Sequence, residues 1–195
     1  QQANITQTQP RIQVFVTTHS QGAVENPRRM LFLYTTLSAL MACSAISTDL
    51  YLPGLPSIES QMGGNIELTI TGFLIGFAIA QLIWGPVSDR IGRKIPLMLG
   101  MAIFAVGSAG CALSSTTTEL VLWRLVQAVG ACVGPMLARA IVRDMYQGVR
   151  AAQVLSTLVL IMAIAPIAGP LLGGFLVVSG GWRLTFWAIV TISAI

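Results

Sequence analysis

The sequence is dominated by long apolar runs separated by short polar links. Five of these runs reach about 20 residues, the length that an α-helix needs to cross the hydrocarbon core of a membrane. They occupy residues 30–52, 68–87, 95–114, 119–141 and 153–178, and a sixth run begins at residue 183. This pattern predicts an all-α membrane protein, because only helices and closed barrels satisfy their backbone hydrogen bonds in lipid.

The composition excludes a soluble domain. Only 9% of the residues are charged and 54% are hydrophobic, with a mean hydropathy of +0.77. A soluble domain carries roughly 25% charged residues, which cover its surface in water. The net charge of +4 does not indicate nucleic-acid binding, because the basic residues lie in short links between apolar runs. The three cysteines lie inside apolar runs without CxxC spacing, so no metal site or disulfide is expected.

The chain divides into two regions of different character. Residues 1–27 are rich in Gln and Thr and show no strong apolar period, so we expect a mobile cytoplasmic tail. Residues 28–195 form the expected transmembrane bundle. The sixth run, residues 183–195, is too short to cross a membrane comfortably, so we expect its helix to be incomplete and the chain to be a fragment of a longer protein.

The basic residues indicate how the helices are oriented. The links on one side hold most of the arginines and lysines, whereas those on the other side hold mainly acids. Because positively charged links stay in the cytoplasm, this distribution predicts a cytoplasmic N-terminus. The expected inside residues are Arg11, Arg28, Arg29, Arg90, Arg93, Lys94, Arg143 and Arg150, and the expected outside residues are Glu59, Glu67, Glu119 and Arg183.

The link between the second and third runs carries a specific charge pattern. It reads Gly-Pro-Val-Ser-Asp-Arg-Ile-Gly-Arg-Lys over residues 85–94, and its second glycine permits a tight turn. The pattern resembles the signature that follows the second helix in the major facilitator superfamily. The resemblance implies a charge network that latches the two halves of a transporter. The matching residues are Gly85, Asp89, Arg90, Gly92 and Arg93.

The fourth run contains an arginine within its apolar length. Arg124 lies about five residues into the run, roughly 7 Å from its start at 1.5 Å per residue. Such an arginine either reaches back to the interface or faces a cavity or a partner, since an unpaired charge in lipid is costly. The segment from Arg124 through Gln127 to Gly130 resembles a motif of the same superfamily, with Ala128 where that motif has glycine.

Prolines and glycines cluster in the fifth run. They are expected to bend the helix and to free backbone carbonyls. The string resembles the motif of the antiporter branch of the superfamily, which favours export by exchange. The residues of this expected kink are Pro166, Gly169, Pro170, Gly173 and Gly174.

Asp49 is the only acid within the apolar length of any run. It precedes Pro53 and Pro56, where a kinked helix is expected to continue toward Ile58. Asp49 either lies near the interface or is buried, and a buried acid can exchange a proton for a ligand. Its depth in the outer part of the membrane is compatible with that of Arg124.

The segment from Asp49 to Pro56, together with residues 139–146, resembles the bicyclomycin and chloramphenicol-resistance family of drug/proton antiporters. The resemblance implies a twelve-helix major facilitator transporter, of which this chain is the N-terminal six-helix bundle. It implies proton-coupled efflux of small amphipathic drugs across the inner membrane by alternating access, with no cofactor other than the proton gradient. The implied partners are the lipid bilayer, the small-molecule substrate, protons and a C-terminal six-helix half, with no nucleic acid.

Single residues take roles from the same resemblance. Asp49 and Arg124 match the positions that couple proton and substrate, and we expect Tyr34, Gln81 and Gln127 to contact substrate. Two alternatives remain: transport of a metabolite such as a sugar, an amino acid or a polyamine, or a truncated half without transport activity. An enzyme is not expected, because the sequence shows no nucleophile–base pair, metal cluster or phosphate loop.

Overall fold

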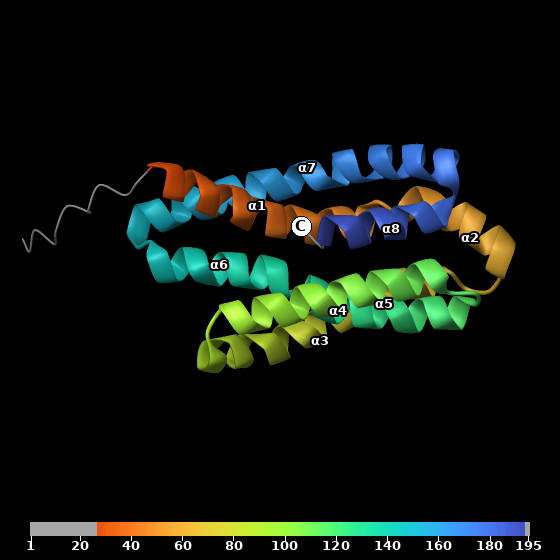
Figure 1. The fold of residues 1–195 in the computed structure, drawn as a ribbon, viewed down its shortest axis with the longest axis horizontal. Coiled ribbons are helices and arrows are strands. Elements are labelled where there is room, and N and C mark those ends of the chain that lie inside the picture. The colour runs from red at the N-terminus through yellow and green to blue at the C-terminus, as the bar shows by residue number, and fades with distance from the viewer. Residues whose placement is uncertain (1–26, 194–195) are drawn as a thin grey trace, which may run out of the picture.

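Helices follow one another along residues 27–193, the part of the chain that the computed structural model describes, with side chains described from residue 35 (Figure 1). No strand occurs in this part, which confirms the predicted all-α fold class. The expected tail, residues 1–27, falls outside it except for residue 27. The elements are α1 (Pro27–Asp49), the 3-10 helix η1 (Leu52–Gly54), α2 (Leu55–Met62), α3 (Glu67–Ile91), α4 (Lys94–Leu113), α5 (Thr117–Ala131), α6 (Val133–Met145), α7 (Gly148–Gly180) and α8 (Trp182–Ser193).

The helices run roughly along the long axis of the molecule in two groups (Figure 1). In one group α1 packs along α7, and in the other α5 packs against both α3 and α4. The groups are joined by α8, which packs against α4 and α7, and by α6, which packs against α1 and α4. The α3–α4 and α6–α7 links lie at the same end of the bundle as the start of α1, and the α4–α5 link lies at the opposite end (Figure 1).

The first predicted span ends earlier than its apolar run. α1 stops at Asp49, and η1 and α2 carry the chain onward. Pro53 lies in the first turn of η1 and Pro56 in the first turn of α2, where the absence of an N–H group is tolerated. The expected continuation toward Ile58 is therefore made by two short helices. The non-helical link after α1 contains Tyr51.

The fourth predicted span differs from the single helix that its apolar run suggests. The structure breaks it at Cys132, between the end of α5 and the start of α6. Pro135 explains the break, because it has no N–H group to bond the Ala131 carbonyl and its ring crowds that carbonyl. As a result α5 stays with α3 and α4, whereas α6 packs against α1 as well.

The fifth predicted span, residues 153–178, lies within the longer helix α7. α7 has 33 residues and continues without a break through Pro166 and Pro170. At 1.5 Å per residue it is about 50 Å long, so it exceeds the roughly 30 Å of hydrocarbon in a bilayer.

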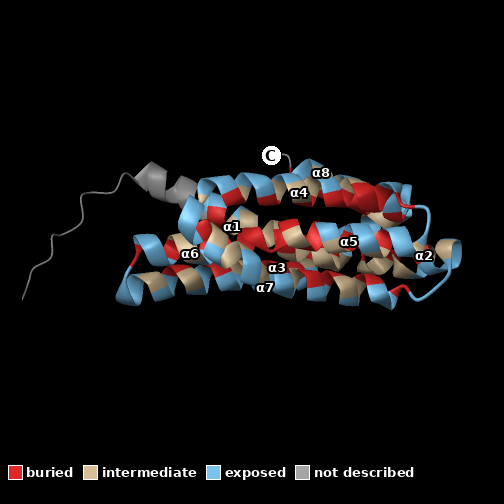
Figure 2. Cartoon of the chain, turned by 90° about the horizontal axis from the view of Figure 1, so that it is seen from below, coloured by how far each residue is buried: buried red, intermediate tan, exposed pale blue. Residues whose placement is uncertain are grey.

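Many large apolar residues are exposed. Figure 2 shows that exposed positions run along the outer faces of the helices. The exposed fractions of Leu82 and Val178 reach 78% and 90%. Four helical stretches of the described chain are long and apolar enough to cross a membrane, namely α3, α4, α5 together with α6, and α7. Because extended apolar surface is unstable in water, the outer faces of these helices are suited to lipid or to a partner. The fold is therefore that of a multi-pass membrane protein.

Glycines bring α4 and α5 into close contact. A Cβ atom on Gly107 would come within 2.5 Å of the backbone nitrogen of Gln127. A Cβ atom on Gly130 would overlap the backbone nitrogen of Phe104. Small residues at such positions allow two membrane helices to approach until their backbones touch. This close packing sets the position of the polar side chains that α5 directs toward α4.

Candidate functional site

Arg124 lies inside the bundle, with 0% of its surface exposed. Its helix, α5, begins with a capping box, in which the Thr116 hydroxyl accepts the backbone N–H of Glu119 and the Glu119 carboxylate accepts the backbone N–H of Thr116. From this start Leu120, Arg124 and Gln127 share one buried face of α5. Of the two placements that the sequence left open, the structure has the arginine facing the bundle interior.

A chain of hydrogen bonds fixes one edge of the Arg124 guanidinium. The Nη1 group donates to Oε1 of Gln127 at 2.6 Å, and Nε2 of Gln127 donates to Oγ of Ser108 on α4 at 2.7 Å. The Ser108 hydroxyl donates in turn to the carbonyl of Phe104 at 2.7 Å. Every group in this chain is buried, so each bond is protected from exchange with water.

Three aromatic rings surround the same guanidinium. Its central carbon lies 3.9 Å from the centroid of the Tyr51 ring, 4.6 Å from that of Phe73 and 5.7 Å from that of Phe186. These distances are typical of cation–π attraction. The Tyr51 hydroxyl pairs with the Thr69 hydroxyl at 3.2 Å, which ties the ring to α3. We call Tyr51, Phe73 and Phe186 the aromatic cage; they come from the link after α1, from α3 and from α8.

The remaining N–H groups of Arg124 find no acceptor among the described residues. Nε and Nη2 are buried and make no hydrogen bond in this part of the chain. Among the side chains of residues 35–193, no carboxylate lies within 4.0 Å of this guanidinium. A buried charge without a counter-charge is costly, by roughly several kcal/mol, and cation–π contacts offset only part of that cost. The two N–H donors of such a group can bind an oxygen acceptor.

Asp49 is the last residue of α1 and is half-buried. It forms no ion pair with Arg124, and no hydrogen bond to its carboxylate is seen among the described residues. Its Cβ atom instead lies against α7, where a Cβ atom on Gly169 would come within 2.7 Å of it. Asp49 is therefore linked to the arginine through the chain, because Tyr51 of the aromatic cage follows two residues later.

The motif of α7 supplies the surface on which the end of α1 rests. Gly173 lies so close to the Leu50 carbonyl that any Cβ atom there would overlap it. A Cβ atom on Gly174, one residue later, would have no neighbour within 4 Å. Pro166 and Pro170 lie in the unbroken helix on either side of Gly169. The glycines of this motif thus allow close contact with the residues that precede the aromatic cage.

The three side chains expected to contact substrate have different surroundings. Gln127 is buried, and its amide is bonded on both sides by Arg124 and Ser108. Gln81 on α3 is partly exposed and no hydrogen bond of its side chain is seen in the described part. Tyr34 lies in α1, but its side chain falls outside the described side chains.

The charged link between α3 and α4 forms a compact network around Arg93. Its Nη1 group donates to Oδ1 of Asp89 at 2.7 Å and to Oγ of Ser88 at 2.8 Å, and its Nε group donates to Oδ2 of Asp144 at 3.0 Å. The hydrogen bond that Arg93 donates to Asp144 raises the pKa of Arg93, burial lowers it, and the bond to Asp89 raises it further. Because Asp144 belongs to α6, the network ties this link to the fourth span.

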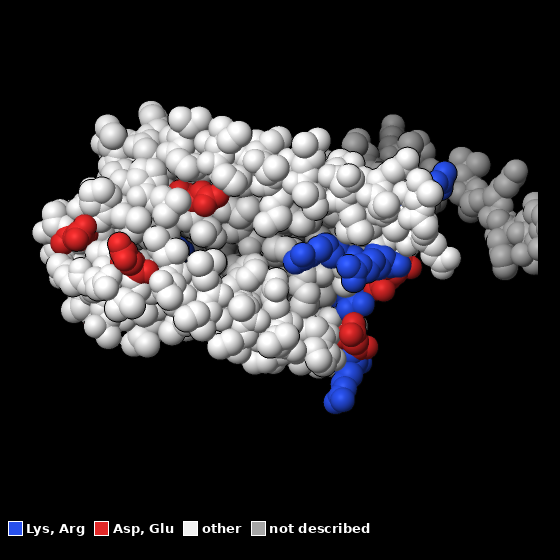
Figure 3. All heavy atoms as spheres, turned by 180° about the vertical axis from the view of Figure 1, so that it is seen from behind, with Lys and Arg blue, Asp and Glu red and all other residues white. Residues whose placement is uncertain are grey.

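The other residues of the proposed latch lie around this network. Gly92 ends α3 with φ of 89°, a conformation that favours glycine. Arg90 is exposed, and Gly85 has open space where its Cβ would lie. Figure 3 shows basic side chains gathered at one end of the viewed face together with some acidic ones, and further acidic patches toward the other end.

Several side chains of the site were not identified from the sequence. Ser108, Phe73 and the ring of Tyr51 had no predicted role, and Asp144 was not assigned to the latch. An isolated serine or aromatic residue in an apolar run looks like ordinary packing, so it gives no signal of its own. Phe186 likewise had no predicted contact with Arg124.

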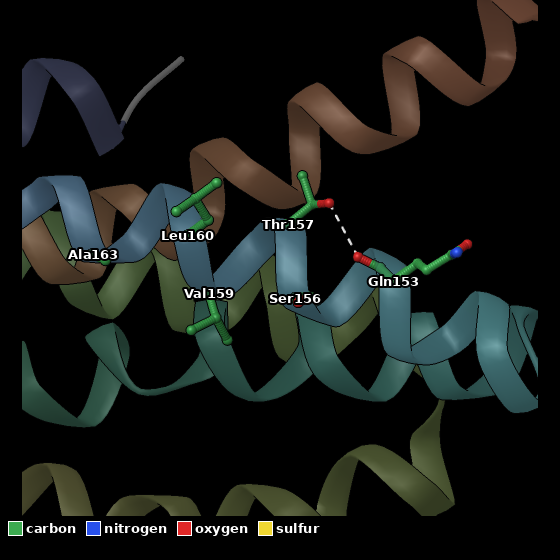
Figure 4. A pocket seen from close by; sticks show the side chains of 6 residues that line it. All are labelled: Gln153, Ser156, Thr157, Val159, Leu160 and Ala163. Carbon is green, nitrogen blue, oxygen red and sulfur yellow. Dashed lines mark hydrogen bonds between the residues drawn. The ribbon is translucent and has the colours of Figure 1, made fainter.

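A separate open hollow lies on the outer face of α7 (Figure 4). Gln153 and Thr157 are joined there by a hydrogen bond from the Thr157 hydroxyl to the Gln153 carbonyl at 3.0 Å. The hollow does not include Arg124 or Asp49, and residues of α7 alone line it: Gln153, Ser156, Thr157, Val159, Leu160 and Ala163. In the described part of the chain, no group of three His, Cys, Asp or Glu side chains is placed to hold a metal ion.

Comparison with known proteins agrees with this architecture. The family model described as Major Facilitator Superfamily matches residues 37–195. YdgK, an MFS-type transporter of Bacillus subtilis, is 36% identical over 176 residues, which make up 87% of this chain and 44% of that protein. Multidrug resistance protein MdtL of Escherichia fergusonii is 35% identical over 156 residues, or 78% of this chain and 40% of that protein. A chloramphenicol resistance protein of Pseudomonas aeruginosa is 35% identical over 154 residues, or 77% of this chain and 37% of that protein.

The chain spans less than half the length of these curated relatives. The resemblance that the sequence motifs indicated is confirmed, because a family model and several relatives cover most of the chain. The same family is one of transporters and not of enzymes. With its all-helical fold and its apolar outer faces, the chain belongs to the major facilitator superfamily.

Proposed function

We propose that this chain is the N-terminal half of an exporter that moves small amphipathic drugs out of the cell in exchange for protons. The names of two relatives, a multidrug resistance protein and a chloramphenicol resistance protein, support drug export as the activity. The coverage of less than half of each relative supports a second half outside this chain. The proposed membrane is the inner membrane, with the basic end of the bundle in the cytoplasm.

The observation that carries the proposal is the buried, incompletely paired Arg124 beside the link that follows Asp49. In the proposed cycle Asp49 binds a proton from the outside as substrate leaves, and its deprotonation inside allows new substrate to bind. Asp49 and Tyr51 lie two residues apart, on either side of the end of α1. A change of charge at Asp49 therefore acts on the residues that hold the aromatic cage over Arg124.

Alternating access requires one part of the bundle to move against another. The contact of α1 with the glycines of α7 is suited to this, because Gly169 and Gly173 present a smooth backbone surface to Asp49 and Leu50. The network of Arg93 lies at the C-terminal end of α3. It is proposed to latch one of the two states of alternating access.

The test uses the complete gene product that contains this chain, expressed in a drug-sensitive strain. We expect the wild type to raise resistance and to show efflux that a proton ionophore abolishes, and we expect Asp49→Asn to lose both. The matched control is Glu59→Gln, which changes an exposed acid on α2. Unchanged efflux in Asp49→Asn would remove Asp49 from the mechanism, and no efflux of any lipophilic compound by the wild type would favour a metabolite transporter.

A further inference from the structure

The surroundings of Arg124 contain polar groups, but no negatively charged group among the described residues pairs with it. Its one hydrogen-bond partner in the described structure, Gln127, is neutral, and Ser108, which Gln127 bonds in turn, is neutral too. The ring faces of the aromatic cage attract the charge but accept no N–H group in the plane of the guanidinium. The site thus keeps a full positive charge and two N–H donors, Nε and Nη2, without an acceptor.

This donor pair has a defined chemical preference. Nε and one Nη group of an arginine form a planar fork that matches the two oxygens of a carboxylate or a nitro group, and either donor can also bind a single carbonyl. A ligand with such an oxygen would satisfy donors that are otherwise buried without a partner. A cationic ligand would instead bring a second positive charge into a site of low dielectric constant, where like charges repel strongly.

We propose that Nε and Nη2 of Arg124 recognise an oxygen acceptor of the transported compound, so that the exporter selects neutral or anionic aromatic compounds and rejects cations. This inference rests on the proposed export function and specifies its substrate class. It depends on the contacts of Arg124 alone and does not require Asp49 to bind the compound.

The aromatic cage also indicates how the compound reaches the arginine. Arg124 is fully covered, so one cage residue must move before the donors become accessible. Tyr51 is the residue held least firmly by secondary structure, because it lies in the link between α1 and η1 whereas Phe73 and Phe186 lie within helices. Besides its contact with Arg124, the Tyr51 side chain pairs with Thr69 through its hydroxyl and lies tilted against Phe186, with ring centroids 5.8 Å apart. A displaced Tyr51 ring would then stack on the aromatic body of the compound.

The test compares three ligands with the same biphenyl body: 4-phenylbenzoate, 4-phenylbenzamide and 4-phenylbenzylammonium. Each competes with radiolabelled chloramphenicol for the purified complete protein at neutral pH. We expect the carboxylate and the amide to compete at least tenfold better than the ammonium compound. In Arg124→Gln the first two are expected to lose at least tenfold in affinity, while the ammonium compound does not lose affinity.

Two further variants separate charge from geometry. Arg124→Lys keeps the charge but has no planar fork, so it should still reject the ammonium compound while binding the amide and the carboxylate less well. Arg139→Gln is the matched control, because Arg139 is an exposed arginine of the same span whose Nε group bonds the Pro135 carbonyl, and it should leave the ligand order unchanged.

The outcomes separate the two proposals. If the ammonium compound binds wild type as well as the carboxylate does, or if folded Arg124→Gln keeps the original order, this inference is overturned while drug export stands. If chloramphenicol and all three compounds neither bind nor are exported, the proposed function itself fails. If Arg124→Gln does not fold, as judged by far-ultraviolet circular dichroism, the ligand order of wild type and of Arg124→Lys decides.

Discussion

The guanidinium carbon of Arg124 lies 3.9 Å from the centroid of the Tyr51 ring. Arg124 forms no ion pair with Asp49, which precedes Tyr51 by two residues. In a direct ion pair, the Asp49 carboxylate would hold either the proton or Arg124. In the structure Arg124 contacts the ring of Tyr51 instead of that carboxylate. The link after α1 connects the two residues, because it follows Asp49 directly and carries Tyr51, whose ring contacts Arg124.

Tyr51 is expected to contribute to stability mainly through its ring. Tyr51→Phe keeps the ring over Arg124 and removes only the hydroxyl pair with Thr69, so it should cost about 1 kcal/mol. Tyr51→Ala removes a fully buried aromatic ring as well, and such substitutions typically cost about 3–5 kcal/mol. Thermal unfolding of the complete protein in detergent measures both variants. Equal midpoints for the two would show that the hydroxyl, and not the ring, stabilises this site.

Gly173 and Gly174 offer a comparison of adjacent positions in one helix. Gly173→Ala would drive its Cβ atom into the Leu50 carbonyl, so we expect α1 to be displaced from α7 and the unfolding midpoint to fall by several degrees. Gly174→Ala meets nothing and should stabilise α7 slightly, by about 0.5–1 kcal/mol, because alanine loses less entropy in a helix. The melting curves of the two variants test this difference. A Gly173→Ala protein as stable as wild type would mean that the two helices separate without cost.

The network of Arg93 should control local motion more than global stability. The side chains of Asp89 and Asp144 are 68% and 55% exposed, so water screens both ion pairs, and each is worth at most about 1 kcal/mol. We expect Arg93→Gln to speed amide hydrogen exchange in residues 88–94 while changing the unfolding midpoint little. Arg90→Gln, an exposed arginine of the same link, is the control. Equal exchange in both variants would argue against a latch.

The same network predicts little dependence of stability on pH through Arg93 in the neutral range. The hydrogen bond to Asp144 raises the pKa of Arg93 above its usual value, which is already far above neutral. A group with a raised pKa in the folded state contributes its full stabilisation below the unfolded pKa, and loses it only as the pH rises through the folded pKa. Unfolding midpoints of wild type and Arg93→Gln should therefore differ by the same amount at pH 6 and pH 8.

The sequence predicted those parts of the site that follow from local pattern. Hydropathy placed α3, α4 and α7 to within a few residues, and the depth of Arg124 made it a candidate before any contact was known. Asp89 and Arg93 are also close in the chain: they lie four residues apart, on either side of the turn at Gly92. These features depend on residues that are close together in the chain.

The parts that could not be predicted depend on contacts between distant helices. Tyr51 and Phe186 meet at Arg124 although 135 positions separate them, and an aromatic residue in an apolar run looks the same whether it faces lipid or protein. Asp144 reaches Arg93 across 51 positions. The break at Cys132 is a different case. Pro135 is a local signal for a helix break, but the length of the apolar run led to the prediction of a single helix.

Arg183 should hold α8 against the end of α4. Its Nε group donates to the Ala112 carbonyl and its Nη2 group to the Ser114 carbonyl, each at 3.1 Å, so it supplies hydrogen bonds to carbonyls at the end of a helix. A cation at this position is also favoured by the negative end of the α4 dipole. Its guanidinium lies 4.5 Å from the Trp182 ring, which restricts the side chain further.

Arg183→Gln is therefore expected to destabilise the bundle by about 1 kcal/mol, discounted from the usual value for charged hydrogen bonds because Arg183 is exposed. Arg183→Lys should lie closer to Gln than to wild type, because one ammonium group cannot reproduce the two directed bonds of the fork. Arg150→Gln, an exposed arginine at the start of α7, is the control. Midpoints of thermal unfolding that match wild type for both Arg183 variants would mean that α8 is held by its apolar face alone.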